Sequence, residues 1–355
     1  MGKDDSNSIE CEGLTGSATY DTATTAFAAL ARRVVLFLTL EAMLLGFSRS
    51  TAAQANVKVY TGEFADGATY LIHVPSDWNG TLLLYSHGYT IPGLSNDADD
   101  LTVCCPLSAS YLLDRGYALA GSSYSKTGWA VDEALSDQIA VLETFNSLVG
   151  EPNRTIAWGH SLGAIITAGL VQNHPDRFAG AMPMCHLGAG AVGLWNVALD
   201  EEFAFTTLIA PDAGLQLVNI TDPTCATSIL NPGSCPNLAL AQDLIANAQA
   251  TPEGRARVAL AAALRDFPHG FRLDPFLVLP REHFFFEFGL RAELEARAGG
   301  NPSWNTGVDY ERQLRRSVDY AEVKALYAQA GLSLDANLDA LTKQGTAHCR
   351  RSGRG

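Results

Sequence analysis

The chain has 355 residues, of which 47% are hydrophobic and 17% are charged. This is long enough for one large α/β domain or for a core that carries a cap. The 24 basic and 38 acidic residues give a formal net charge of −14. Such an acidic surface repels phosphate backbones, so we expect no nucleic-acid partner.

The N-terminus has the three parts of a secretory signal peptide. Two arginines precede an apolar run over residues 34–47, which is interrupted only by Glu41, and a small-residue exit follows that ends at Ala55. This pattern predicts a leader over residues 1–55, cleavage after Ala55, and a secreted or periplasmic protein. The alternative is an uncleaved leader that anchors the chain in a membrane. We expect no stable membrane partner beyond export.

Short apolar runs alternate with helical patterns over residues 56–186. Strands are predicted at residues 57–61, 69–74, 81–86, 117–121, 155–161 and 179–184, and helices at residues 111–116, 132–149 and 162–173. The first two strands form an expected hairpin, and the third is apolar throughout, as in a strand buried on both faces. This order favours a mostly parallel sheet with helices on both faces.

The pattern changes after Cys185. Residues 187–345 contain helical patterns and loops and no run typical of a buried strand. The helical patterns cover residues 251–264, 282–298, 308–330 and 334–341. We therefore expect a large helical cap over residues 187–345. We expect an unstructured tail over residues 346–355, where the charge turns basic.

The chain has seven cysteines, and none of their spacings resembles a zinc site, so we expect no bound metal. Cys225 and Cys235 flank the sequence Asn-Pro-Gly at residues 231–233, which favours a turn. Such a turn can bring the two cysteines together in a local disulfide. The adjacent Cys104 and Cys105 are poorly placed to bond with each other.

The strongest motif is Gly-His-Ser-Leu-Gly at residues 159–163, which matches G-x-S-x-G. A short apolar strand runs into Ser161, and an apolar helical pattern leaves it. Glycines at both ends of the motif permit a sharp turn and close packing of strand and helix. The motif therefore predicts a serine exposed on a strained strand-to-helix turn, which is a nucleophile elbow.

Over residues 57–185 the chain resembles the α/β-hydrolase superfamily, and in particular its secreted, esterase-like members. Three features carry the resemblance: the elbow, the His87-Gly88 turn after a buried strand, and their order. The stretch over residues 121–129 also looks like the loop after the fourth strand in such proteins. The resemblance implies an α/β-hydrolase fold with a large helical cap and Ser161 as the nucleophile. It also implies an oxyanion hole made by the backbone N–H groups of Leu162 and Tyr89, with no cofactor.

The catalytic acid and histidine of the superfamily are not recognisable in the sequence. The superfamily order is Ser, then Asp or Glu, then His, and only His348 lies late enough to fit. No apolar strand precedes His348, and Cys185-His186 occupies the place where some members carry the acid. We therefore hypothesise a truncated or frame-shifted hydrolase that lacks its last two core strands. Such a sheet would expose an apolar edge and lower the stability of the fold.

The leading interpretation is a serine hydrolase that cleaves a small carboxylic ester through an acyl-enzyme on Ser161. A peptidase or amidase of the same fold is an alternative. A further alternative is a catalytically incomplete hydrolase that acts at most as a binding module, because fold alone does not establish activity.

Overall fold

The computed structural model describes residues 56–94, 106–227, 232–265 and 290–351. The predicted leader over residues 1–55 lies outside the described residues, as do Cys104 and Cys105. None of the helices in the described ranges is long and apolar enough to cross a membrane.

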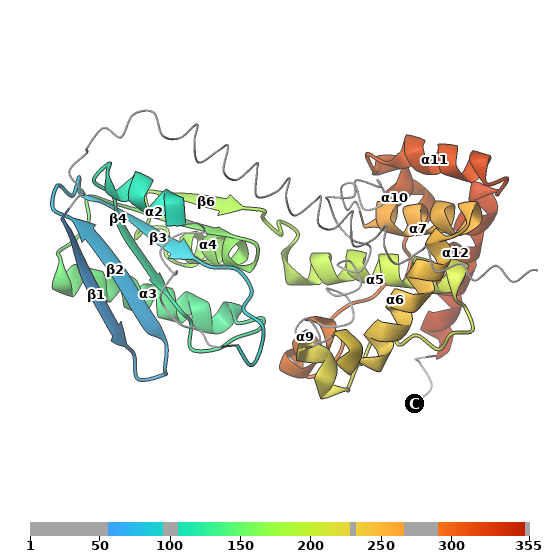
Figure 1. The fold of residues 1–355 in the computed structure, drawn as a ribbon, viewed down its shortest axis with the longest axis horizontal. Helices are drawn as coiled ribbons and strands as arrows, with labels where there is room; N and C mark the ends of the chain where they lie inside the picture. Colours follow the sequence, from blue (N-terminus) through green and yellow to red (C-terminus); the bar gives the residue numbers. More distant parts are fainter. Residues whose placement is uncertain (1–55, 95–105, 228–231, 266–289, 352–355) are drawn as a thin grey trace, which may run out of the picture. The chain divides into compact units, whose positions relative to one another are not determined.

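Six strands form one mixed sheet (Figure 1). They are β1 (Val57–Glu63), β2 (Thr69–Pro75), β3 (Thr81–Ser86), β4 (Ala118–Ser122), β5 (Arg154–His160) and β6 (Gly180–Met184), in the order β1-β2-β4-β3-β5-β6. The hairpin β1-β2 joins β4 antiparallel, and β4, β3, β5 and β6 are all parallel. The expected hairpin and the expected mostly parallel sheet are therefore confirmed.

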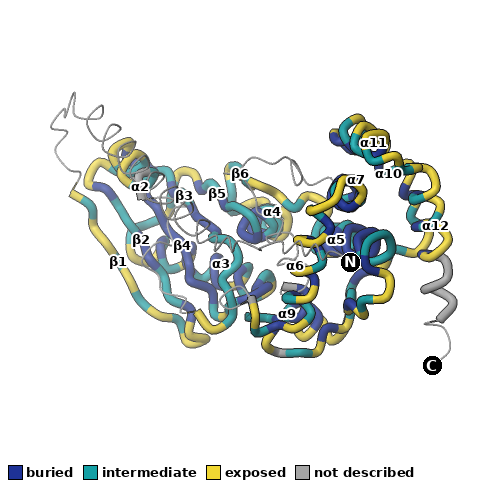
Figure 2. Tube along the Cα trace, turned by 45° about the vertical axis from the view of Figure 1, so that its right-hand side comes forward, coloured by how far each residue is buried: buried dark blue, intermediate teal, exposed yellow. Residues whose placement is uncertain are grey.

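Helices cover both faces of the sheet, as the sequence predicts. On one face, α3 (Val131–Leu148) and α4 (Leu162–Asn173) pack apolar side chains against β3, β4 and β5. On the other face, α2 (Pro106–Leu113) packs against Tyr85, Leu119 and Trp158. Every residue of β4 is buried, and Figure 2 shows buried residues along the central strands and also in helices such as α5. This burial removes apolar area from water and is the main favourable contribution to folding of the core.

Strand β6 forms one edge of the sheet within the described residues. It pairs with β5 on one side, and the side chain of Met182 on it is 49% exposed. The exposed apolar strand agrees with the predicted edge, whereas the predicted loss of stability stays a prediction.

The residues after β6 are helical. Their elements are α5 (Gly190–Ile209), η2 (Pro223–Thr227), η3 (Pro232–Ser234), α6 (Pro236–Gln249), α7 (Pro252–Leu264), α9 (Leu290–Ala298), α10 (Tyr310–Arg316), α11 (Tyr320–Gln329) and α12 (Leu334–Arg351). The described part of residues 187–345 contains no strand, as expected. Thr251 caps α7 by accepting a hydrogen bond from the N–H of Gly254, in agreement with the cap-and-proline pattern in the sequence.

Two predictions about these helices are wrong. The helical pattern over residues 308–330 is split into α10 and α11, because Ser317 adopts an extended backbone (φ −65°, ψ 140°) and ends α10. The unstructured tail expected from residue 346 is instead helical as far as Arg351, where α12 ends. Alanine, arginine and lysine near this end have high helix propensities. Together these propensities outweigh the unfavourable helix propensity of Gly345.

Helix α5 buries three consecutive acidic residues, Asp200, Glu201 and Glu202. Glu202 forms an ion pair with Arg291 at 2.9 Å, and Glu201 forms one with Arg265 at 3.0 Å. Asp200 accepts hydrogen bonds from the hydroxyl of Tyr310 (3.2 Å) and from the side-chain amide of Gln313 (3.0 Å). These contacts join α5 to segments far away in the sequence, so the acidic run organises the helical part of the chain.

The buried carboxyl of Asp200 makes stability depend on pH. Burial raises its pKa to about 6 from 3.8, although Gln313 and Tyr310 lower it in part. The folded protein therefore holds this proton more tightly than the unfolded chain, and stability falls as pH rises from about 4 to about 6. A shift of this size corresponds to about 3 kcal/mol. We expect Asp200→Asn to remove this contribution, so that the wild-type minus variant free energy of unfolding decreases over this pH range in urea titrations. A difference that is flat with pH would contradict the assignment.

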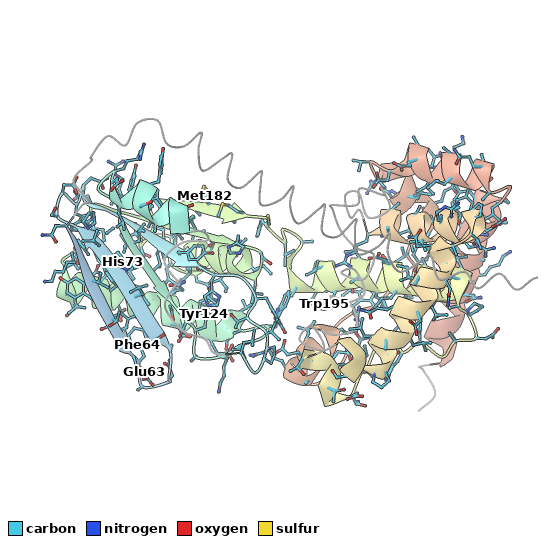
Figure 3. All side chains as sticks on the ribbon, viewed as in Figure 1. Glu63, Phe64, His73, Tyr124, Met182 and Trp195 are labelled. Atoms are coloured by element: carbon cyan, nitrogen blue, oxygen red, sulfur yellow. A yellow bond between two sulfur atoms is a disulfide. The ribbon has the colours of Figure 1, made fainter. Side chains whose placement is uncertain are left out.

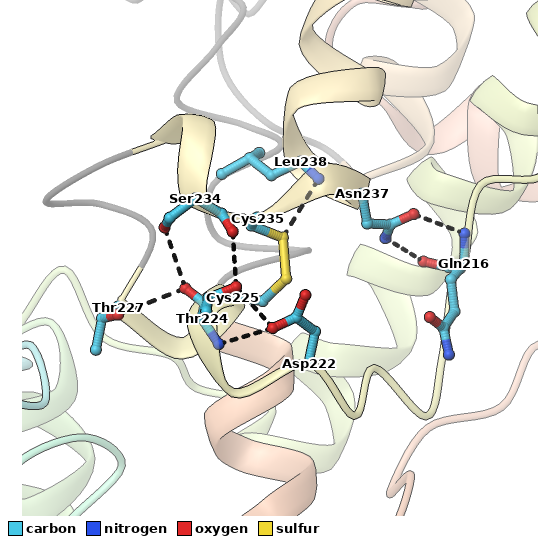
Figure 4. The surroundings of a disulfide bond; sticks show 9 residues. All are labelled: Gln216, Asp222, Thr224, Cys225, Thr227, Ser234, Cys235, Asn237 and Leu238. Carbon is cyan, nitrogen blue, oxygen red and sulfur yellow. Dashed lines mark hydrogen bonds between the residues drawn. A yellow bond between two sulfur atoms is a disulfide. The ribbon is translucent and has the colours of Figure 1, made fainter.

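Cys225 and Cys235 form a disulfide, and both cysteines are buried (Figure 4). The local disulfide that the turn sequence predicts is therefore confirmed. Around it, the hydroxyl of Thr224 donates to Asp222 and contacts the carbonyl of Ser234, which connects η2 to η3.

We expect loss of this disulfide to lower the free energy of unfolding by about 3 kcal/mol, the value for closing a loop of roughly ten residues in the unfolded chain. The double variant Cys225→Ala/Cys235→Ala, measured by urea denaturation, tests this. Cys185→Ala is the matched control, because Cys185 is exposed and forms no disulfide. Equal stability of the double variant and the control would contradict the prediction.

Candidate active site

Ser161 lies at the junction of β5 and α4, where the sequence predicts the elbow. Its backbone has φ 56° and ψ −123°, a conformation that L-residues rarely adopt. Its N–H donates to the carbonyl of Met184 at 3.1 Å, and its own carbonyl accepts from the N–H of Ala164 at 3.0 Å. These bonds hold a conformation that costs on the order of 1–3 kcal/mol elsewhere. The elbow is therefore a strained turn that two backbone hydrogen bonds maintain, with Ser161 at its centre.

The two glycines of the motif are required by close backbone contacts. A Cβ at Gly159 would lie 2.5 Å from the carbonyl oxygen of Ser86 and 2.7 Å from that of Gly163. A Cβ at Gly163 would collide with the carbonyl oxygens of Ser86 and His87. Because backbone atoms cannot turn aside as flexible side chains do, these positions admit only glycine without a shift of strand against helix.

The turn after β3, residues 87–89, runs directly past the elbow. A Cβ at Gly88 would lie 3.6 Å from the Cβ of Ser161 and 3.4 Å from Nε2 of His160. Tyr89, whose N–H is the expected oxyanion donor, follows immediately. Burial raises the pKa of Tyr89, and the nearby carboxylate of Glu293 on α9 raises it further, so its phenol stays neutral. The structure thus places the turn beside the serine.

Leu162 is the first residue of α4, and its side chain is buried. N–H groups in the first turn of a helix have no partner within the helix. They also lie at the positive end of the helix dipole, which favours negative charge nearby. A negative charge that develops on an acyl oxygen beside Ser161 would therefore be stabilised by the N-terminal end of α4.

The two histidines closest to the elbow are both engaged elsewhere. His87 directs Nδ1 at the carbonyl oxygen of Gly88 (2.7 Å), and its Nε2 lies 3.2 Å from the carbonyl oxygen of Ser123. Nδ1 of His160 forms a hydrogen bond with the hydroxyl of Tyr85 at 2.7 Å. Burial lowers the pKa of both imidazoles, although the two carbonyl contacts raise that of His87. The side chain of His160, which directly precedes Ser161, is thus held by Tyr85.

Within the part of the chain that the structure describes, no hydrogen bond joins the hydroxyl of Ser161 to a histidine. His186 is exposed after β6. The predicted order singles out His348, which lies on α12, but its side chain is outside the described residues. His269 and His283 lie outside the described residues altogether, as does the aromatic cluster at residues 284–288. The described residues thus contain a candidate nucleophile and two candidate donors.

Helix α9 contacts the loop after β4, a contact that the sequence does not indicate. Glu293 accepts from the N–H of Trp129 at 3.0 Å, and Arg297 forms an ion pair with Glu133 at 2.8 Å. The indoles of Trp129 and Trp195 pack edge to face, with their centroids 5.9 Å apart. Figure 3 shows Trp195 at the start of α5. These contacts attach two helices of the predicted cap to the loop that also borders the turn after β3.

Two cavities open on the described helices. One of about 540 Å³ is bordered by α7 and α10, and one of about 710 Å³ is bordered by α9 and residues 219–226. Neither is lined by Ser161 or Leu162. Among the described residues, no group of three or more His, Cys, Asp or Glu side chains is placed to hold a metal ion.

No family model matches the chain. An o-phthalyl amidase of Xanthobacter agilis is 28% identical over 320 residues, which cover 80% of this chain and 67% of the amidase. Among solved structures, an esterase of Pyrococcus furiosus is similar at 14% identity with a TM-score of 0.31, covering 46% of this chain and 57% of that one. Brefeldin A esterase, described as a bacterial homologue of human hormone-sensitive lipase, is similar at 14% identity with a TM-score of 0.30, covering 83% of this chain and 79% of that one.

Proposed function

We propose that this chain is a serine hydrolase of the α/β-hydrolase superfamily that cleaves small carboxylic esters through an acyl-enzyme on Ser161. The observation that carries the proposal is the backbone of Ser161. Its strained turn between β5 and α4 presents the hydroxyl beside the first N–H groups of a helix and beside the turn that holds Tyr89. An active-site strain of this kind persists only where surrounding contacts maintain it.

The proposed reaction needs no cofactor. The Ser161 oxygen attacks the acyl carbon while its proton passes to a base, and the N–H groups of Leu162 and Tyr89 stabilise the oxyanion. The bond to the alcohol then breaks, and the alcohol leaves with a proton. Water hydrolyses the acyl-enzyme, which releases the acid and restores the serine hydroxyl.

Substitution of single histidines identifies the base of this reaction. His87 and His160 make other contacts, so we expect their replacement to leave proton transfer in place. His269, His283 and His348 are the histidines whose side chains are not described, and alanine substitution of each tests them. The base is the one whose loss lowers kcat most and removes the pH dependence of kcat near neutrality.

Amide hydrolysis is the second candidate, favoured by the similarity to an amidase. Both reactions share the acyl-enzyme and differ in the leaving group, because an amine needs protonation to leave. The p-nitrophenyl ester and the p-nitroanilide of the same acyl group separate them. We expect the ester to be cleaved faster, and a faster anilide would assign the chain as an amidase. No turnover of either by folded protein would leave only a binding role and would contradict the proposal.

We also propose that the protein is exported. The signal-peptide pattern ends at Ala55, and the Cys225–Cys235 disulfide is typical of proteins from oxidising compartments. Mass spectrometry of the protein recovered from the producing cell tests this. We expect an N-terminus at Asn56, and a chain that retains residues 1–55 would support the anchored alternative.

A further inference from the structure

Tyr124 lies in the loop after β4 with a left-handed backbone, φ 63°. Such a conformation is a genuine outlier for a bulky side chain and persists where other contacts maintain it. Its N–H donates to the hydroxyl of Ser122 at 3.0 Å, and its side chain is buried (Figure 3). The strained backbone directs a phenol into the core beneath the turn at residues 87–89.

The phenol of Tyr124 contacts His87 in two ways. Its hydroxyl donates to the carbonyl oxygen of His87 at 3.1 Å. Its ring stacks on the imidazole, with centroids 3.9 Å apart and an angle of 19° between the planes. The backbone and the ring of His87 are therefore both fixed by one side chain.

The position of the His87 ring sets the direction of the Tyr89 N–H. Nδ1 of His87 donates to the carbonyl oxygen of Gly88 at 2.7 Å. That carbonyl and the N–H of Tyr89 belong to the same planar peptide, so holding the oxygen on one side aims the N–H to the other. The chain of contacts thus runs from Tyr124 through His87 to the expected oxyanion donor.

The loop that carries Tyr124 is itself held on both sides. Asp137 on α3 accepts from the N–H of Ser125 at 2.7 Å and from its hydroxyl at 3.0 Å. Further along the loop, the N–H of Gly128 donates to the carbonyl of Thr90 at 2.8 Å. The loop therefore contacts the turn at residues 87–89 through Tyr124, and it contacts Thr90, directly after this turn, through Gly128.

We propose that Tyr124 is a positioning residue for the oxyanion hole, acting through His87 on the peptide that carries the Tyr89 N–H. This inference rests on the proposed function, since it assigns the catalytic consequence of the contact. Preorganised donors stabilise the transition state without reorganisation during the reaction. Loss of the Tyr124 hydroxyl should therefore lower kcat and leave KM nearly unchanged.

Tyr124→Phe tests the proposal, because phenylalanine keeps the ring that stacks on His87 and removes only the hydroxyl. Tyr111→Phe is the matched control, since the Tyr111 side chain is 57% exposed on α2. With p-nitrophenyl acetate, we expect a decrease in kcat of about 10-fold for Tyr124→Phe, the effect of one net hydrogen bond, with KM within about 2-fold. The control should match the wild type.

Hydrogen exchange at the peptide containing residues 86–91 gives a readout that needs no turnover. We expect faster exchange of this peptide in Tyr124→Phe than in the wild type and the control, with exchange in α3 unchanged. Equal exchange in all three proteins, or a rise in KM at constant kcat, would overturn the role of Tyr124. A folded wild type that does not hydrolyse the ester would instead contradict the proposed function, and the exchange measurement still decides the contact.

Discussion

Replacement of Ser161 by alanine is expected to lower kcat/KM for p-nitrophenyl esters by at least about 10⁴-fold, because no other group at the elbow can form the acyl bond. Binding and the oxyanion donors remain, so a small residual rate over water is expected. Thermal stability should stay close to the wild type, since the side chain of Ser161 makes no hydrogen bond within the described residues. The measurement is initial rates at saturating and limiting ester.

Ser147→Ala is the matched control for this substitution. Ser147 is exposed near the end of α3 and far from the elbow in the sequence. We expect this variant to keep the full rate. A Ser161→Ala variant that retained more than about one tenth of the wild-type rate would remove Ser161 from the mechanism, because losing a nucleophile cannot have so small an effect.

Gly163→Ala is expected to lower the free energy of unfolding by more than about 3 kcal/mol, at the upper end of the range for overpacking. The added methyl would collide with the carbonyl oxygens of Ser86 and His87, which belong to β3 and to the turn that follows it. Relief would require α4 to move away from the sheet, which also moves Leu162 and Ser161. We therefore expect loss of activity with loss of stability, measured by urea denaturation and ester hydrolysis.

Gly169→Ala is the control on the same helix. Its Cβ would lie 3.0 Å from Cδ2 of Leu135, a flexible side chain that can shift. Alanine also gains about 1 kcal/mol of helix propensity over glycine. We expect a change within about 1 kcal/mol. Equal stability of Gly163→Ala and Gly169→Ala would show that strand and helix are not in close backbone contact at the elbow.

The core was predictable because its signals are local. Apolar runs, glycines and turn residues predicted the bounds of each of the six strands to within a few residues. The G-x-S-x-G pattern gave the place of Ser161 between a strand and a helix, and the serine has the strained backbone that this context demands. The order of the strands was not predicted, because β5 pairs with β3 rather than with β4, which precedes it in the chain, and this pairing leaves no local signal.

The helical part was less predictable because its organising contacts are distant and polar. A run of three acidic residues in α5 would ordinarily lie in solvent, and nothing local indicates that Arg265 and Arg291 pair with it. The break at Ser317 depends on one extended residue within a helical pattern. At the candidate site, the left-handed backbone of Tyr124 has no sequence signature, since the residue is neither Gly nor Asn.

Covalent labelling by a fluorophosphonate tests the central claim most directly, because the reagent reports whether Ser161 is activated in the folded chain. The protein is incubated with the probe, and intact mass and peptide mapping locate the adduct. We predict one adduct per chain, on the peptide that contains Ser161, and none in Ser161→Ala. Folded wild-type protein that takes up no probe, or takes it up at another residue, would contradict a serine hydrolase built on this elbow.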